Sequence, residues 1–270
     1  MDRIVTISNF NSYTGRYSLK KNRRPIKKKT DWYIEDNLLE TIPVLALRNR
    51  GINSNDGSPV WWKNDRNLRQ AIVLTMETLK AWQAFRPEKA SNLMPKLEDG
   101  LPRIVLAFQR QMAKYAIETI WDIMQLKQDK YNEVLRLITK TVSEVSSYKS
   151  VDVPMLGSKI MHFLFPEFFP VWDTAWIMNE CLINEPDHLG CWLPNDIQSE
   201  LKYHSKAASM YSYYFALMMN DLNKTRDKEY SNIEEALIRH SGIPREVIDW
   251  HFYDISPIVY EFCLLGKHIR

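Results

Sequence analysis

Hydrophobic residues recur along most of this chain at steps of three and four, which is the spacing of amphipathic helices. The stripes are bounded by residues typical of caps, turns and loops. The expected helices span residues 30–50, 65–85, 102–126, 129–148, 195–223, 231–242, 244–252 and 256–268. No run shows the sustained two-residue alternation of strands. The sequence therefore predicts an all-α protein, long enough for one large domain or for two lobes that share a cleft.

Two stretches do not fit a helical stripe. Residues 86–102 form a polar connection by composition, and residues 1–29 lack helical periodicity and are expected to form an arm before a helical domain at 30–270. The arm holds a basic run, KKNRRPIKKK, with no acidic residue, although the formal net charge of the whole chain is only +3. Its basic residues are Lys20, Lys21, Arg23, Arg24, Lys27, Lys28 and Lys29. Such a run favours phosphate binding through counterion release, with a solvated tail or an anionic membrane surface as alternatives.

Cysteine content and hydropathy narrow the class of protein. No apolar run approaches the roughly 18 residues of a membrane span, and the N-terminus lacks a signal-type core, so we expect a cytoplasmic protein. The three cysteines, Cys181, Cys191 and Cys263, form neither a CxxC pair nor the set of four that an iron–sulfur cluster needs. Structural thiols are the expected role, with a metal site as the alternative. No metal, cofactor or obligate protein partner is inferred.

One segment, VDVPMLGSKIMHFLFPEFFPVWDT at 151–174, has the residue types of a chemical site. A proline and a short turn lead to Gly157, which permits close backbone approach. The free amides of the following helical turn could hold an anion such as a DNA phosphate. Lys159 lies in that turn, where the helix dipole and desolvation both favour a neutral amine. After an apolar helix, an aromatic loop ends at Asp173, fourteen residues beyond the lysine.

These residues resemble the helix-hairpin-helix DNA glycosylase superfamily, the group of endonuclease III and oxoguanine glycosylase. The family hairpin, L-P-G-V-G-x-K-T-A, overlays Val153-Pro154-Met155-Leu156-Gly157-Ser158-Lys159, and its V-D-T-H motif overlays Val171-Trp172-Asp173-Thr174. Met155 replaces the first hairpin glycine and Ala175 replaces the histidine. The resemblance implies two helical lobes around a cleft, with a helix-hairpin-helix motif at about 139–165.

The same resemblance implies roles for individual residues. Gly157 and Ser158 would meet the backbone of double-stranded DNA, Asp173 would be the catalytic carboxylate, and Lys159 would take the position of the nucleophile in bifunctional members. A flipped base needs an aromatic pocket. The candidates for its walls are Phe168, Phe169, Trp172 and Trp176, with Trp61 and Trp62 from an earlier loop.

A carboxylate beneath the sugar stabilises the positive charge that develops when an N-glycosidic bond breaks. A lysine that reaches C1′ forms a Schiff base and permits strand cleavage; otherwise an intact abasic site remains. The divergent motif resembles bacterial phage-defence glycosylases, which suggests a modified base such as glucosylated hydroxymethylcytosine. Asp173 as a helix cap, Lys159 as a solvent or phosphate lysine, and the aromatics as core remain open. A non-catalytic DNA-binding protein and an all-α interaction factor are the alternative functions.

Overall fold

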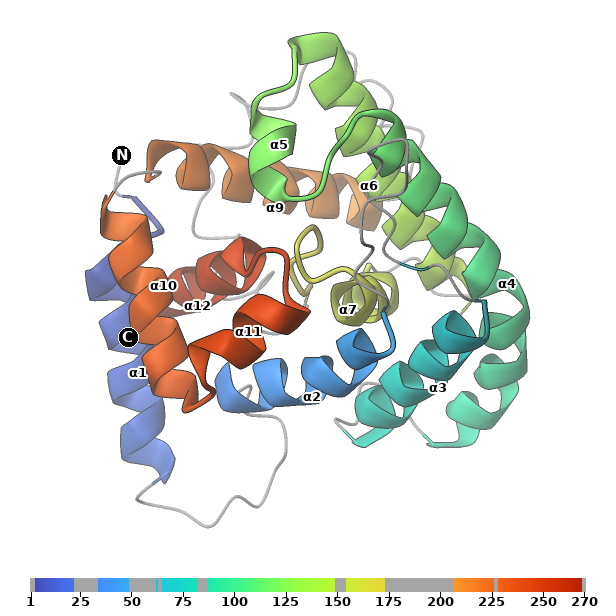
Figure 1. Ribbon diagram of the computed structural model, residues 1–270, viewed down its shortest axis with the longest axis horizontal. Helices are drawn as coiled ribbons and strands as arrows, with labels where there is room; N and C mark the ends of the chain where they lie inside the picture. The colour runs from blue at the N-terminus through green and yellow to red at the C-terminus, as the bar shows by residue number, and fades with distance from the viewer. Residues whose placement is uncertain are drawn as a thin grey trace.

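The computed structural model confirms the all-α prediction, because helices are the only regular elements in the part of the chain it describes (Figure 1). It describes residues 3–21, 34–48, 62, 65–81, 87–148, 154–172, 206–225 and 228–268. The helices are α1 (Ile7–Lys21), α2 (Ile34–Ala46), α3 (Asp65–Ala81), α4 (Pro87–Lys114), α5 (Ile120–Met124), α6 (Gln128–Ser147), α7 (Met155–Leu164), α9 (Lys206–Lys224), α10 (Lys228–Ser241), α11 (Arg245–His251) and α12 (Ser256–His268).

Helix α7 lies at the centre of the fold and is seen nearly end-on in Figure 1. Helices α2, α3 and α6 pack directly against it. Every residue from Leu156 to Leu164 is buried, including one lysine and one histidine. A helix that is apolar on nearly all sides is stable in water only when other elements surround it, so the sequence of α7 dictates its central position.

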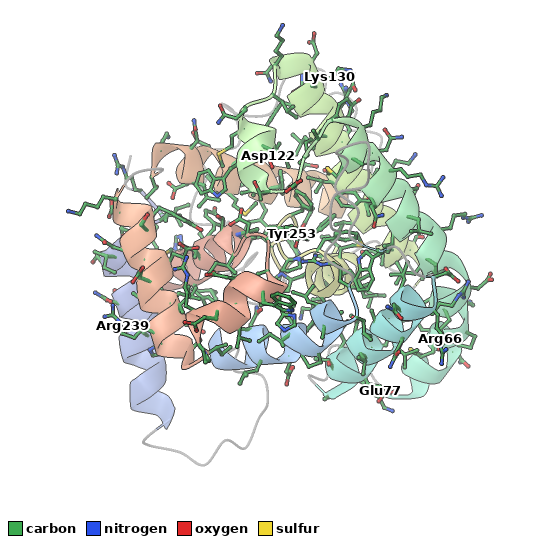
Figure 2. The ribbon with its side chains drawn as sticks, viewed as in Figure 1. Arg66, Glu77, Asp122, Lys130, Arg239 and Tyr253 are labelled. Carbon is green, nitrogen blue, oxygen red and sulfur yellow. The ribbon has the colours of Figure 1, made fainter. Side chains whose placement is uncertain are left out.

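The surrounding helices also contact one another around α7. Helix α3 packs on α2 and α4, α4 packs on α6, and α9 contacts α6. Helix α10 packs on α2, and α12 contacts α1, α9 and α10. Charged side chains such as Arg66, Glu77, Lys130 and Arg239 point outward from the rim in Figure 2. No helix in the described ranges combines the length and the apolar character needed to cross a membrane.

The prediction that the N-terminal residues form an arm without helix is wrong for Ile7–Lys21, which is α1. This helix packs along α12, where the rings of Tyr13 and Phe262 lie 4.8 Å apart. A side chain at Gly266 would collide with the carbonyl of Asn9, so the two backbones approach closely. The Asp221 carboxylate on α9 also accepts hydrogen bonds from the Ile4 and Val5 amides. Tertiary contacts therefore form a helix that its own periodicity does not indicate.

The polar connection expected at 86–102 is also wrong, since α4 runs from Pro87 to Lys114 through two prolines. Each proline removes a backbone hydrogen bond and normally ends or kinks a helix. The apolar stripe nevertheless continues across both of them with Leu93, Leu97, Leu101, Val105, Phe108 and Met112, all of which are buried. Packing of this stripe on α3 and α6 maintains the helix. The helix expected to reach residue 126 ends at Lys114, and α5 follows as a separate short element.

Candidate functional site

The first turn of α7 is packed against α6 and does not open toward solvent. The Gly157 amide donates to Ser146 Oγ at 3.0 Å. A Cβ at this position would lie 2.1 Å from the Val142 carbonyl oxygen, so only glycine lets the two helices approach so closely. The hypothesis that this amide binds a DNA phosphate is therefore wrong for this structure. The glycine serves helix packing, because its amide is already bonded and buried.

Ser158 is likewise internal and is not placed to contact DNA. It has no exposed surface; its hydroxyl donates to the Met155 carbonyl at 3.2 Å and accepts from the Trp172 amide at 3.0 Å. This second bond joins the start of α7 to the end of the loop that follows the helix, fourteen residues later. The chain from Ser158 to Trp172 thus returns on itself, so its two ends meet.

Lys159 follows Ser158 and is buried, with 7% of its surface exposed. Its proposed partner in catalysis, Asp173, is the residue after Trp172 and lies outside the described residues, as do Trp61 and Trp176. The side chains of the seven basic residues of the 20–29 run are also outside the described part of the chain.

The segment 165–172 has no helix, and side chains from several helices bind it. His162 Nδ1 lies 2.7 Å from the Phe169 carbonyl, and Tyr211 Oη on α9 donates to the Pro170 carbonyl at 3.2 Å. An irregular buried segment needs such partners, because its backbone groups lack a ladder and are shielded from water. The path of the loop is therefore restrained at three of its residues, Phe169, Pro170 and Trp172.

A buried ion pair attaches the same loop to α2 and α11. Arg48 Nη1 lies 2.8 Å from Glu167 Oε1, and neither side chain is exposed. Arg48 also donates to the carbonyls of Leu164 at 3.4 Å and His251 at 3.0 Å. Its guanidinium stacks 4.7 Å from the centre of the Tyr253 ring, which lies in the middle of the view in Figure 2. One arginine thus connects three segments of the chain.

His162 connects the loop to the other end of α2. Its Nε2 lies 3.1 Å from the Asn37 side chain, and both residues are buried. Burial lowers the pKa of His162 to about 4, although the bond to the Phe169 carbonyl acts in the opposite direction. The ring is therefore neutral at pH 7 and carries a single N–H, so it donates to one of its two oxygen neighbours, the Phe169 carbonyl or Asn37 Oδ1. These contacts give His162 a structural role, since they join α7 to α2 and to the loop.

The aromatic residues predicted to line a base pocket are core residues wherever the structure describes them. Phe168 and Phe169 are fully buried, with ring centres 5.8 and 5.0 Å from that of Phe108. Trp172 is 1% exposed and packs edge-on against two tyrosines of α9, Tyr211 and Tyr214. Trp62 is 2% exposed, and its amide donates to Gln109 Oε1. The alternative role as core is the one that these contacts support.

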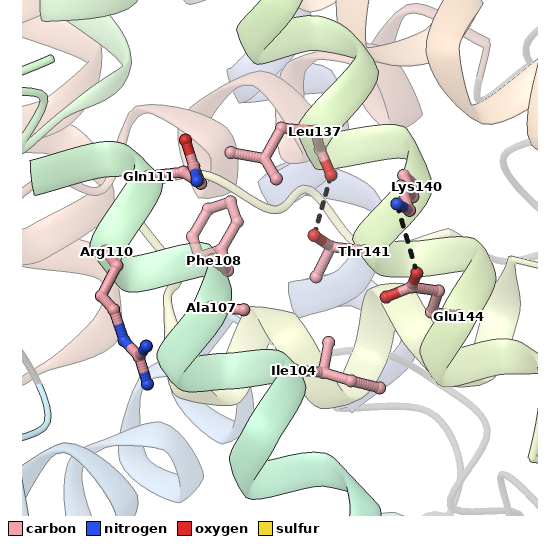
Figure 3. Close-up of a pocket in the computed structure, with 9 residues that line it drawn as sticks. All are labelled: Ile104, Ala107, Phe108, Arg110, Gln111, Leu137, Lys140, Thr141 and Glu144. Carbon is pink, nitrogen blue, oxygen red and sulfur yellow. Dashed lines mark hydrogen bonds and ion pairs between the residues drawn. The ribbon is translucent and has the colours of Figure 1, made fainter. Parts of the chain in front are cut away.

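A pocket of about 420 Å³ opens between α4 and α6, away from the predicted site residues (Figure 3). Its walls are largely apolar, with the Lys140–Glu144 ion pair on one rim and Arg110 extending away from the centre. Phe108 belongs both to this pocket and to the ring cluster beneath the 165–172 loop. The pocket is thus separated from the loop by one aromatic layer.

Sequence patterns indicated the loop but missed the residues that hold it. Arg48, Glu167 and Tyr211 were not candidates, since their partners are 119 and 41 residues away along the chain. One signal was available: Glu167 is a lone charge within the apolar run HFLFPEFFPVW. Within the described ranges, no group of three or more histidines, cysteines and acids could hold a metal ion. Comparison of the chain with protein-family models, curated proteins and solved structures finds no match.

Proposed function

We propose that this chain is a DNA glycosylase of helix-hairpin-helix type, which flips a modified base from duplex DNA and cleaves its N-glycosidic bond. The supporting observation is the bond between Ser158 Oγ and the Trp172 amide. The residues that follow these two are Lys159 and Asp173, the pair on which the resemblance depends. A lysine and an aspartate are the two residue types that this chemistry uses, and each directly follows one end of this chain return in the sequence.

The proposed hairpin consists of α6, the connection after it and α7, which are consecutive helices in direct contact. In this proposal two helical lobes enclose the DNA cleft, and Asp173 stabilises the developing positive charge of the sugar. Because Gly157 and Ser158 are already bonded within the protein, phosphate contacts come from other groups, with the basic run 20–29 as the leading source. The proposed substrate is double-stranded DNA that contains glucosylated hydroxymethylcytosine.

The test is release of free base from duplexes that carry modified cytosines and other altered bases, with and without alkali. Breaks that need alkali indicate a glycosylase that leaves an abasic site, and breaks without alkali indicate an associated lyase. Asp173→Asn should abolish base release and retain the helical circular dichroism spectrum. Asp129→Asn, at an exposed aspartate in the first turn of α6, is the matched control and should remain active.

Lys159→Ala separates the two chemical routes. If Lys159 is the nucleophile, borohydride should trap an enzyme–DNA adduct with the wild type and none with this variant. Lys140→Ala, at an exposed lysine on α6, should leave trapping unchanged. Full base release by Asp173→Asn would show that the catalytic assignment is wrong.

A non-catalytic DNA-binding protein is the second candidate. The observation that favours it is the burial of Phe168, Phe169, Trp172 and Trp62, which removes four of the six proposed pocket walls from contact with a base. Such a protein would bind duplex DNA with a steep dependence on salt and release no base from any substrate. Asp173→Asn would then leave its affinity unchanged.

A further inference from the structure

The last three residues of the described loop are held by groups from two different helices. Tyr211 on α9 binds the Pro170 carbonyl, and Ser158 on α7 binds the Trp172 amide. Both bonds are buried and both involve the backbone, so they restrain the path of the chain and not the orientation of a side chain. Two points of attachment two residues apart restrict both the position and the direction in which the chain leaves Trp172.

Tyr211 is well suited to a fixed donor role. Its side chain has no exposed surface, and its ring contacts those of Trp172 and Tyr214 at centre distances of 6.3 and 6.2 Å. Burial, helped by the nearby Glu261 carboxylate, raises the pKa of Tyr211 well above its ordinary value. The phenol is therefore protonated at neutral pH and can donate to the Pro170 carbonyl.

Ser158 is anchored equally well. It lies in the first turn of the central helix, and its hydroxyl proton is directed to the Met155 carbonyl, so that a lone pair faces the Trp172 amide. The same turn carries Lys159. One serine thus relates the backbone of the lysine to the backbone at the end of the loop through a single hydrogen bond.

We propose that Tyr211 and Ser158 are positioning residues that fix the Pro170–Trp172 backbone relative to the helical turn that carries Lys159. This inference rests on the proposed glycosylase function. Neither residue touches the substrate; each acts through the loop backbone. Misplacement of a reacting group by about 1 Å can lower a rate by roughly 100-fold, so loss of one attachment should reduce turnover far more than it reduces substrate binding.

The experiment compares Tyr211→Phe and Ser158→Ala with the wild type in base release from the duplex that the wild type cleaves best. Each change deletes one oxygen atom and retains the packing volume almost unchanged. We expect kcat to fall roughly 10- to 100-fold in each variant, while KM and duplex affinity are preserved. Exchange of the Trp172 amide, followed by NMR, should accelerate in Ser158→Ala, because its acceptor is removed.

Tyr230→Phe is the matched control. It removes another buried tyrosine hydroxyl, which lies 2.6 Å from Ser256 Oγ, and it should retain kcat. If the wild type is active and both variants keep its kcat, the positioning role is wrong and the glycosylase function stands. The same conclusion follows if the variants change only KM. Equal loss of kcat in Tyr230→Phe would also overturn it, because general destabilisation would then explain the result. A wild type that releases no base overturns the proposed function, and this inference with it.

Discussion

Replacing Glu167 by leucine is expected to lower the free energy of unfolding by about 3–5 kcal/mol, because the change leaves the Arg48 guanidinium buried without its counter-charge. Neither side chain has exposed surface, and the Nη1–Oε1 distance of 2.8 Å is that of a charge-assisted hydrogen bond. Removing one ion of a buried pair strands the other, whereas removing both allows apolar packing.

Arg48→Met should lower the free energy of unfolding at pH 7 by at least as much as Glu167→Leu, because the arginine also donates to the Leu164 and His251 carbonyls. The two variants should differ in their dependence on pH. A stranded carboxylate can bind a proton as the pH falls, so the penalty of Arg48→Met should shrink in acid. A stranded guanidinium cannot lose its proton in a protein, so the penalty of Glu167→Leu should not show this relief.

The double variant Arg48→Met/Glu167→Leu completes a double-mutant cycle. Its loss of unfolding free energy should be smaller than the sum of the losses in the two single variants. Urea unfolding followed by circular dichroism gives the four free energies. The matched control is Asp65–Arg69, which has the same 2.8 Å N–O distance but half-exposed side chains, and should show a much smaller coupling. Additive losses at Arg48 and Glu167 would refute the conclusion that this contact is a buried ion pair.

Two further predictions concern helix packing and acid stability. Gly157→Ala places a Cβ 2.1 Å from the Val142 carbonyl oxygen, so it should force α7 away from α6 and cost about 1–3 kcal/mol, measured as a lower Tm; an unchanged Tm would contradict the close approach. His162 has a pKa of about 4 in the folded protein against 6.5 unfolded, so its contribution of up to about 3 kcal/mol is lost as the pH falls from 6.5 toward 4. Burial raises the pKa of Asp254 to about 7, so its effect is opposite, and stability falls as the pH rises from about 4 to 7. Asp254→Asn should therefore steepen the loss of unfolding free energy between pH 7 and pH 4, and His162→Asn should flatten it. Denaturant titrations at each pH give these free energies. A dependence of the free energy on pH equal to that of the wild type in both variants would contradict both assignments.

The sequence predicted those helices that can be recognised from their hydrophobic stripe alone. The stripes expected at 65–85 and 129–148 correspond to α3 and α6, and the stop at Gly242 is confirmed by its positive φ of 70° directly after α10. Helix α1 was missed because its sequence is rich in Ser, Asn and Tyr, and its stability depends on α12. The start of α4 was missed because residues 86–102 are polar in composition, although an apolar stripe runs through this stretch and across both of its internal prolines.

The sequence singled out the segment 151–174, but it did not indicate that the residues described there pack inside the protein. Neither spacing nor composition can tell whether Phe168 and Phe169 face a ligand or another helix, because the deciding neighbour, Phe108, is about sixty residues earlier. The same holds for Gly157, whose restriction arises from the Val142 carbonyl on a different helix. Local sequence defines which groups are present, and only tertiary packing decides which of them remain accessible.

The polar groups buried around the 165–172 loop require a reason other than stability. Arg48, Glu167, His162 and Lys159 all lie in the interior, where polar and charged groups are costly and where apolar residues of similar volume would usually serve as well or better. Hydrogen bonds and ion pairs have preferred directions, so each of these bonds favours one path of the loop over the others. These bonds connect the segment to α7, α9, α11 and the residues that follow α2, and they restrain its last described residues, Pro170 and Trp172. The first residue beyond that end is Asp173, which is why its substitution is the most informative single experiment on this protein.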